Sequence, residues 1–444
     1  MQIPERRRVL QTQIRDVDCV VYNIGQLATV AAEALDGLGL VKQAALAAQG
    51  GRIVWIGPTS DWHLRVSPTQ GATLIDAQRR LVTPGFVDSH THLVHAGQRA
   101  AEFHQRLSGV DYAAQLAEAD SSDARQLRGI LRTVHATRAE NEFALAASAQ
   151  RRLRSAVAHG TTTLEIKTGY GLSLAAEGAL LNAIGRLQHR GPRVLATFLG
   201  AHTVPEEYRD RRAAYVRLVI DEMLPAFAGR ADFCDIFVEA QAFSVEEARR
   251  ILTVARGLGY RLKLHVEQLS HQGGAQLAAE LGATSADHLD YCTREDALAL
   301  AKAGTVATLL PNCSMTLRTA YPNARLFLEA GCTLALATDY NPGTAPSENM
   351  QLVVALAVLR MGLSPTEALR AATLGGAAAL GLSHEIGSLE VGKAADLLIW
   401  EAEDALEMGY HLGTNRVETV VVGGRVLHTL SAQAPWGPDA EAGF

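Results

Sequence analysis

Two histidines in the segment PGFVDSHTH, residues 84–92, give the clearest chemical signal in the chain. In a β-strand, residues i and i+2 point to the same side, so His90 and His92 would project together. Two imidazoles placed in this way suit one bound metal ion. Two polar histidines at a strand end would explain an isolated pair equally well, so the motif alone leaves both interpretations open.

Three further residues of ligand type favour the metal interpretation. His265 ends the run LKLH, His288 ends SADH, and Asp339 ends LATD. In a parallel barrel, catalytic groups gather at the C-terminal ends of the strands. Because imidazoles and a carboxylate together suit zinc or iron, we predict a metal ion at this rim.

The elements that would position these residues alternate along the chain. Short apolar or β-branched runs are separated by segments with helical spacing, among them 142–159, 213–226 and 245–258. This alternation predicts an α/β fold, a (β/α)8 TIM barrel. The predicted strands are 86–90, 162–166, 194–200, 233–238, 262–265, 284–288, 305–309 and 333–337.

Strand-type runs, such as 19–24 and 395–400, also occur at both ends of the chain. They predict a small β-sandwich domain that is assembled from both termini. The expected division gives 1–83 and 388–444 to this domain and 84–387 to the barrel.

Composition excludes several classes of protein. The net charge of -6 over 444 residues argues against a nucleic-acid-binding protein, which would carry basic patches. The five cysteines are scattered and form no CxxC pair, so neither a disulfide framework nor a cysteine zinc site is expected. No signal peptide or membrane span is predicted, and a reducing, cytoplasmic setting is expected.

The motifs together resemble those of the amidohydrolase superfamily. The HxH pair, the later His265, His288 and Asp339, and the closing run GSLEVGKAADL at 387–397 carry this resemblance. Within the superfamily the chain is similar to the imidazolonepropionase family, from about Thr83 to Gly424. The closer likeness lies in HAGQRAAEF at 95–103, KTGYG at 167–171, FLGAH at 198–202 and ATDYNPGT at 337–344.

The resemblance implies an activity and a set of functional residues. The activity is hydrolysis of the ring C–N bond of 4-imidazolone-5-propanoate to N-formimidoyl-L-glutamate, a step of L-histidine degradation. His90, His92, His265 and Asp339 would hold one divalent or trivalent metal ion, zinc or iron. A homodimer is expected, because superfamily members often dimerise. The positions implied to contact the substrate are Arg99, Tyr170, His202, Asn341, Gly343 and Thr344.

The chain departs from the family pattern at two places. Some members have a glutamate where this chain has Gln268, three residues after His265. An amide is a poor proton acceptor, so Gln268 is expected to bind the ring, and proton transfer is assigned to His288 and Asp339. The polar segment 121–128 stands where the family commonly has a Gly-rich stretch, and we expect the longer polar segment 118–128 to be a mobile loop near the barrel mouth.

The implied substrate fits the chemistry of these residues. A metal ion would lower the pKa of a bound water and polarise the lactam carbonyl. The planar guanidinium of Arg99 can pair with the propionate, for which Tyr112 is a further candidate. Each role has a structural alternative: a surface salt bridge for Arg99, loop packing for Tyr170, a buried satisfied ring for His202, pure ligation for Asp339 and a plain turn for NPGT.

Two other functions stay open at this point. An aminohydrolase that deaminates a heterocycle would share the metal residues but would not need Arg99. A non-catalytic barrel could keep the metal for structure or for partner binding. A second metal on a carboxylated lysine is disfavoured, because the fourth strand ends near 238–239 without a lysine, and Lys167 follows the second strand instead.

Overall fold

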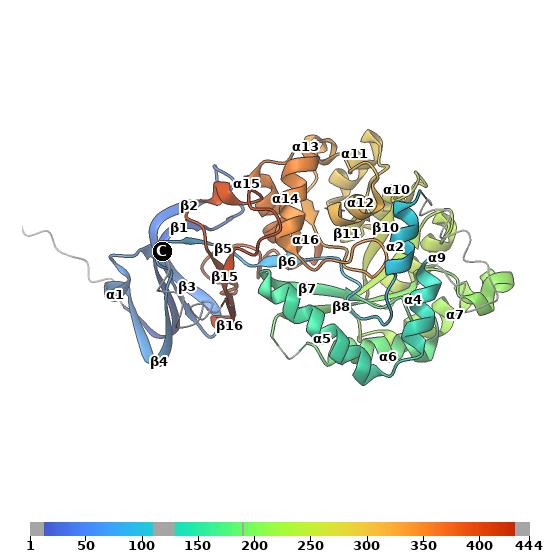
Figure 1. The fold of residues 1–444 in the computed structure, drawn as a ribbon, viewed down its shortest axis with the longest axis horizontal. Helices are drawn as coiled ribbons and strands as arrows, with labels where there is room; N and C mark the ends of the chain where they lie inside the picture. Colours follow the sequence, from blue (N-terminus) through green and yellow to red (C-terminus); the bar gives the residue numbers. More distant parts are fainter. Residues whose placement is uncertain (1–12, 110–128, 189–190, 431–444) are drawn as a thin grey trace, which may run out of the picture.

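The protein is described here by a computed structural model that covers residues 13–109, 129–188 and 191–430. These residues form two eight-stranded sheets. Figure 1 shows the two parts side by side, with the small β domain in blue and red and the barrel with its helices beside it. The segment 118–128 and Tyr112 lie outside the described residues.

A parallel sheet forms the centre of the larger part. Every ladder between its neighbouring strands is parallel. Its residues are nearly all buried, because helices cover the outer face and side chains fill the interior. The predicted (β/α)8 barrel is therefore confirmed. Its strands are β6 (Phe86–Asp88), β7 (Thr161–Lys167), β8 (Arg193–Ala201), β9 (Phe233–Val238), β10 (Arg261–Val266), β11 (Ser285–His288), β12 (Val306–Leu309) and β13 (Leu334–Leu336).

The first and last barrel strands meet through contacts beyond the ladder. In the described part of the chain, the sheet runs from β13 to β6 and no ladder joins these two ends. The N–H and hydroxyl of Thr338 donate instead to the carboxylate of Asp88, at 3.0 and 2.6 Å. Backbone hydrogen bonds of 3.0 and 2.8 Å then join residues 90 and 92 to 339 and 340. The segment after β6 is thereby fixed against the segment after β13.

Helices follow the strands and cover the barrel. The helices α9 and α11 each begin with a capping box, in which Ser244 and Thr293 bond N-terminal amides that the helix leaves unpaired. The segment predicted as one helix at 213–226 is a run of α7, the π-turn η2 and α8. None of the described helices is long and apolar enough to cross a membrane. The helices of this part are α2 (Ala100–Leu107), α4 (Gly129–Arg138), α5 (Glu142–Ala158), α6 (Leu174–Gly185), η1 (Glu206–Arg211), α7 (Arg212–Leu218), η2 (Val219–Met223), α8 (Leu224–Phe227), α9 (Val245–Gly257), α10 (Gly274–Leu281), α11 (Arg294–Ala303), α12 (Pro311–Leu317), α13 (Ala324–Ala330), α14 (Met350–Met361), α15 (Pro365–Arg370), η3 (Ala371–Gly375) and α16 (Gly376–Ala379).

Strands from both ends of the chain build the second sheet, as predicted. The strand β5 pairs in parallel with β1 and antiparallel with β14, so the two chain ends meet at β5. The strands form one continuous mixed sheet rather than two separate sheets. The boundaries 83/84 and 387/388 stay predictions; the sheets change between Pro84, which ends β5, and Phe86. The elements are β1 (Ile14–Ala28), β2 (Leu40–Gln49), β3 (Arg52–Pro58), α1 (Trp62–Arg65), β4 (Val66–Asp76), β5 (Leu81–Pro84), β14 (Leu397–Trp400), η4 (Ala405–Glu407), β15 (Val417–Val422) and β16 (Arg425–Thr429).

Candidate metal site

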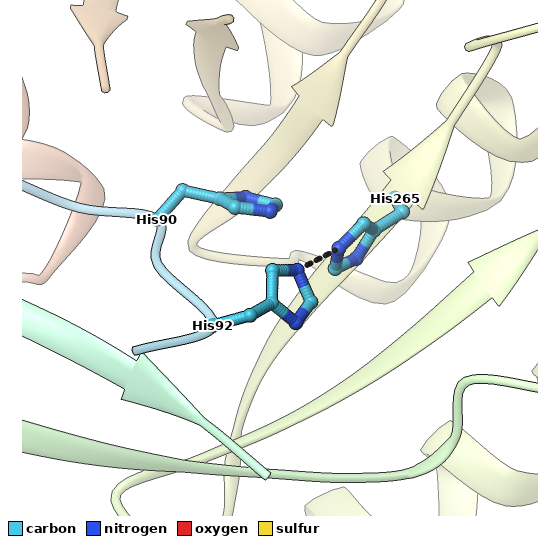
Figure 2. Close-up of side chains that lie close together, drawn as sticks. All are labelled: His90, His92 and His265. Atoms are coloured by element: carbon cyan, nitrogen blue, oxygen red, sulfur yellow. Dashed lines mark hydrogen bonds between the residues drawn. The ribbon is translucent and has the colours of Figure 1, made fainter. Parts of the chain in front are cut away.

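His90 and His92 lie just beyond the strand that was expected to carry them. The predicted strand end at residue 90 is wrong, because β6 stops pairing with β7 after Asp88. The chain then pairs with the segment after β13 through a single bridge between Thr91 and Tyr340. Thr91 separates the two histidines in sequence, and the side chains of both histidines point toward one centre (Figure 2).

Residues from several strand ends converge at this centre. Nε2 of His92 lies 3.3 Å from Nε2 of His265. Oδ1 of Asp339 lies 3.5 Å from Nε2 of His90 and 3.8 Å from Nε2 of His92. His288 joins His90 and Asp339 in a second group, whose ligand atoms lie within 4.8 Å of one another. The structure thus brings all five predicted residues together, and all five are buried.

The donor atoms fit a metal ion. Nε2 of His90 is buried and has no hydrogen-bond partner among the described residues. The Nε2 atoms of His92 and His265 face each other, and their lone pairs would repel unless a cation or a proton lay between them. Imidazole nitrogens with a carboxylate are the ligand set that zinc and iron prefer. The buried histidine cluster is therefore a metal-binding site.

Two buried aspartates determine how the histidines present their nitrogens. Nδ1 of His90 lies 2.6 Å from Oδ2 of Asp287, and Nδ1 of His265 lies 3.1 Å from Oδ1 of Asp235. Carboxylate oxygens accept, so each Nδ1 carries a proton and each Nε2 keeps its lone pair for the metal. Neither aspartate was predicted from the sequence, where a charged residue inside a buried strand was the available signal.

Burial controls the charges of the site. It lowers the pKa of His90, His92 and His288 well below the ordinary range, so their rings are neutral and keep a lone pair for a cation. Burial raises the pKa of Asp339 well above its usual range, a shift that a bound cation opposes. His288 and Asp339 also have φ angles of 80° and 53°. Such left-handed conformations are uncommon outside glycine and persist where the surrounding structure enforces them.

Tyr170 and His202 lie beside the metal-binding histidines. The ring of Tyr170 lies 5.8 Å from the ring of His92, and the ring of His202 stacks on His92 at 5.1 Å. Nδ1 of His202 donates to the Gly169 carbonyl at 3.0 Å, so Nε2 of the neutral ring is an acceptor. The carboxylate of Glu177 accepts three N–H groups of the loop that carries Tyr170 and so fixes this loop.

Arg99 is buried, so the interpretation as a surface salt bridge is wrong. Its side chain is 2 % exposed, and its Nε donates to Oε2 of Glu102 at 2.9 Å. A Cβ atom added to Gly343 would collide with the Arg99 guanidinium. The guanidinium can therefore occupy this position only because residue 343 has no side chain. Arg106 donates to the Gly343 carbonyl at 2.7 Å and holds the same loop.

The loop after Asp339 is held by its own side chains. The side-chain oxygen Oδ1 of Asn341 accepts the N–H groups of Gly343 and Thr344 at 2.8 and 2.7 Å, which supports the turn interpretation for Asn341. Gln268 donates to Sγ of Cys313 at 3.5 Å. Burial raises the pKa of the Cys313 thiol, which sequence analysis did not single out. Substrate contacts stay predictions for all seven residues, Arg99, Tyr170, His202, Gln268, Asn341, Gly343 and Thr344.

Known proteins are similar to this chain in sequence and in fold. Residues 81–427 match the amidohydrolase family. Imidazolonepropionase from Symbiobacterium thermophilum is 46% identical over 93% of this chain and 98% of its own. Imidazolonepropionase from Geobacillus kaustophilus is 41% identical over 89% and 92%.

Two solved structures show the same fold at low identity. Guanine deaminase from E. coli has a TM-score of 0.69 and 17% identity, over 93% of this chain and 100% of that one. Atrazine chlorohydrolase from Arthrobacter aurescens, complexed with zinc, has a TM-score of 0.67 and 19% identity, over 93% and 96%. The sequence relatives are far more similar to this chain than these two structures are. The chain belongs to the amidohydrolase family and, within it, to the imidazolonepropionases.

Proposed function

We propose that this protein hydrolyses the ring C–N bond of 4-imidazolone-5-propanoate and releases N-formimidoyl-L-glutamate. One arrangement carries the proposal: the guanidinium of the buried cation Arg99 lies directly against Gly343, in the loop that follows the cluster residue Asp339. A substrate that bears both an anionic propionate and a cyclic amide needs a cation beside a metal centre. The relatives named imidazolonepropionases support the same assignment.

The ligands that we assign to one metal ion are His90, His92, His265 and Asp339. Zinc or iron held there would supply Lewis-acid chemistry that polarises the lactam carbonyl and lowers the pKa of water. Arg99 pairs with the propionate through its planar fork. Its position fixes the other end of the substrate, so that the lactam carbonyl lies at the ligand cluster.

We assign proton transfer to His288 and Asp339. The His288 ring is neutral and lies 5.6 Å from the His90 ring. Ligand atoms of His288, His90 and Asp339 lie within 4.8 Å of one another. One of the two takes the proton of the attacking water, and the proton then passes to the ring nitrogen as the C–N bond breaks. Nε2 of His202 accepts a ring N–H, and Gln268 orients the ring with its amide.

We also propose a homodimer. The loop after β14 leaves the large apolar side chains of Leu406, Tyr410 and Leu412 exposed, at 73%, 76% and 58%. Exposed apolar side chains of this kind favour association of two copies. Light scattering on the purified protein is expected to give twice the mass of one chain, and the mass of a single chain would contradict the dimer.

The test is turnover of freshly prepared 4-imidazolone-5-propanoate together with metal analysis of the same sample. We expect N-formimidoyl-L-glutamate as product, no release of ammonia, and loss of both metal and activity in the variant His90→Asn/His92→Asn. Ammonia release from a heterocycle would favour the aminohydrolase instead. Full activity of a metal-free sample would disprove the metalloenzyme, and a metal-loaded protein without turnover would favour the non-catalytic barrel.

A further inference from the structure

Lys167 lies fully buried at the end of β7, behind the metal-binding histidines. Its Nζ lies 2.7 Å from Oε1 of Glu165, 2.7 Å from Oδ2 of Asp235 and 3.9 Å from Oδ2 of Asp287. Burial alone would lower the pKa of Lys167, but the charges of Asp235, Glu165 and Asp287 outweigh burial and raise this pKa above its usual range. The side chain is therefore an ammonium ion. A carboxylated lysine needs a neutral amine, so Lys167 is unsuited to hold a second metal.

Two of these carboxylates bind the metal-ligand histidines directly. Asp287 accepts from Nδ1 of His90 at 2.6 Å, and Asp235 accepts from Nδ1 of His265 at 3.1 Å. The Lys167 ammonium group contacts both carboxylates. It therefore links the support of His90, which follows the first barrel strand, to the support of His265, which lies in the fifth.

The third carboxylate fixes the backbone between His90 and His92. Oε2 of Glu165 accepts the N–H of Thr91 at 3.2 Å, and the hydroxyl of Thr91 donates to the Glu165 carbonyl at 2.6 Å. Lys167 bonds Oε1 of this same side chain. Each of the three carboxylates that surround the ammonium group therefore supports a different part of the ligand set.

We propose that Lys167 is a positioning residue for the metal site, whose ammonium group holds Glu165, Asp235 and Asp287 in the geometry that orients His90, His92 and His265. The inference rests on the metal site of the proposed function. Three carboxylates in a dry interior repel one another unless a cation lies between them. Without that cation they move apart or take up protons, and the histidines lose the acceptors that fix their tautomers.

The test measures zinc affinity by competition with a chromophoric chelator, on the parent protein and on Lys167→Met. We expect Lys167→Met to bind zinc about 10- to 100-fold more weakly, the usual effect of removing a group that orients metal ligands. The Co²⁺-loaded variant is also expected to show an altered visible absorption spectrum, because the ligand geometry changes. Both measurements are independent of catalytic activity.

Lys263→Met is the matched control. Lys263 is equally buried, and it donates to Oγ of Ser285 at 2.7 Å. Within the described residues it forms an ion pair with Asp287 at 3.6 Å but, unlike Lys167, none with Glu165 or Asp235. Its removal is expected to keep zinc affinity within a few-fold of the parent. An equal loss in both variants would show a general effect of buried charge and overturn the proposal.

Unchanged zinc affinity in Lys167→Met would also overturn the proposal that Lys167 positions the metal ligands. If this variant does not fold, Lys167→Gln and Glu165→Gln replace it, because both keep polar side chains of similar size. We expect each to weaken zinc binding by about 10-fold, and parent-like affinity in either would contradict the proposal. A parent protein that binds no zinc or other divalent ion would overturn the proposed function itself.

Discussion

Nδ1 of His90 lies 2.6 Å from Oδ2 of Asp287, a residue 197 positions further along the chain. Both side chains are completely buried. The Asp287 carboxylate accepts a hydrogen bond from the Nδ1 proton of His90. The ring therefore turns Nε2 toward the remaining ligands. The capacity of His90 to bind a metal therefore depends on a residue that does not itself reach the metal-binding centre.

Asp287→Asn is expected to weaken metal binding by about 10- to 100-fold, because an amide is a poorer acceptor for the His90 Nδ1 proton. Metal content after dialysis against a weak chelator measures the effect. Asp296→Asn is a control, since Asp296 is also buried but pairs with the exposed ring of His271 outside the cluster. Metal content in Asp287→Asn as high as in Asp296→Asn and in the parent would show that the Asp287 contact is dispensable.

Arg99→Ala is expected to raise KM for 4-imidazolone-5-propanoate by about 10- to 100-fold, in line with the loss of one charge-assisted hydrogen bond to the propionate. Because the reacting amide is at the other end of the substrate, kcat should change less. The control is Arg132→Ala, which removes an exposed cation 3.9 Å from the same Glu102. A parent-like KM in Arg99→Ala would remove the basis for the substrate assignment.

Gly343→Ala is expected to act like a milder Arg99 variant, because the added Cβ would collide with the guanidinium. Displacement of this side chain should raise KM several-fold and leave the metal content unchanged. Gly185→Ala is the matched control, since a Cβ there meets no atom within 4 Å. Kinetics of the two variants side by side decide whether the position of Arg99 depends on Gly343.

The metal-free protein is expected to lose stability in mild acid through its buried histidines, among them His95 and His202. Burial lowers the pKa of each to about 3, whereas an unfolded histidine titrates near 6.5. Between these values the unfolded state binds protons that the folded state does not. The free energy of unfolding therefore falls as the pH drops from about 6.5 toward 3, by up to about 1.4 kcal/mol per pH unit for each histidine.

Urea unfolding of the metal-free protein at neutral and mildly acidic pH measures this slope. The variant His202→Asn should show a shallower dependence, because it removes one of the buried histidines that the folded state keeps neutral. His384→Asn, at a side chain that is 72% exposed, should keep the slope of the parent. A slope that His202→Asn leaves unchanged would mean that another group governs acid unfolding.

The sequence by itself determined the barrel and the residues that would meet at its rim. Local alternation of strand and helix patterns is visible in one chain, and each predicted barrel strand overlaps an observed one. The ends of parallel barrel strands share one rim whatever their distance in sequence. His265, His288 and Asp339 could therefore be predicted as neighbours of the HxH pair without any coordinates.

Only the tertiary structure decided what lies behind those ligands. Glu165, Lys167, Asp235 and Asp287 stand inside buried strands, where the sequence shows a charged residue but not its partner. The partner depends on strand register and on closure of the barrel: His265 lies beside Asp287 in the sheet, yet Asp287 bonds His90. Such contacts across the interior arise from packing between segments far apart in sequence, and they leave no local periodicity from which they could be predicted.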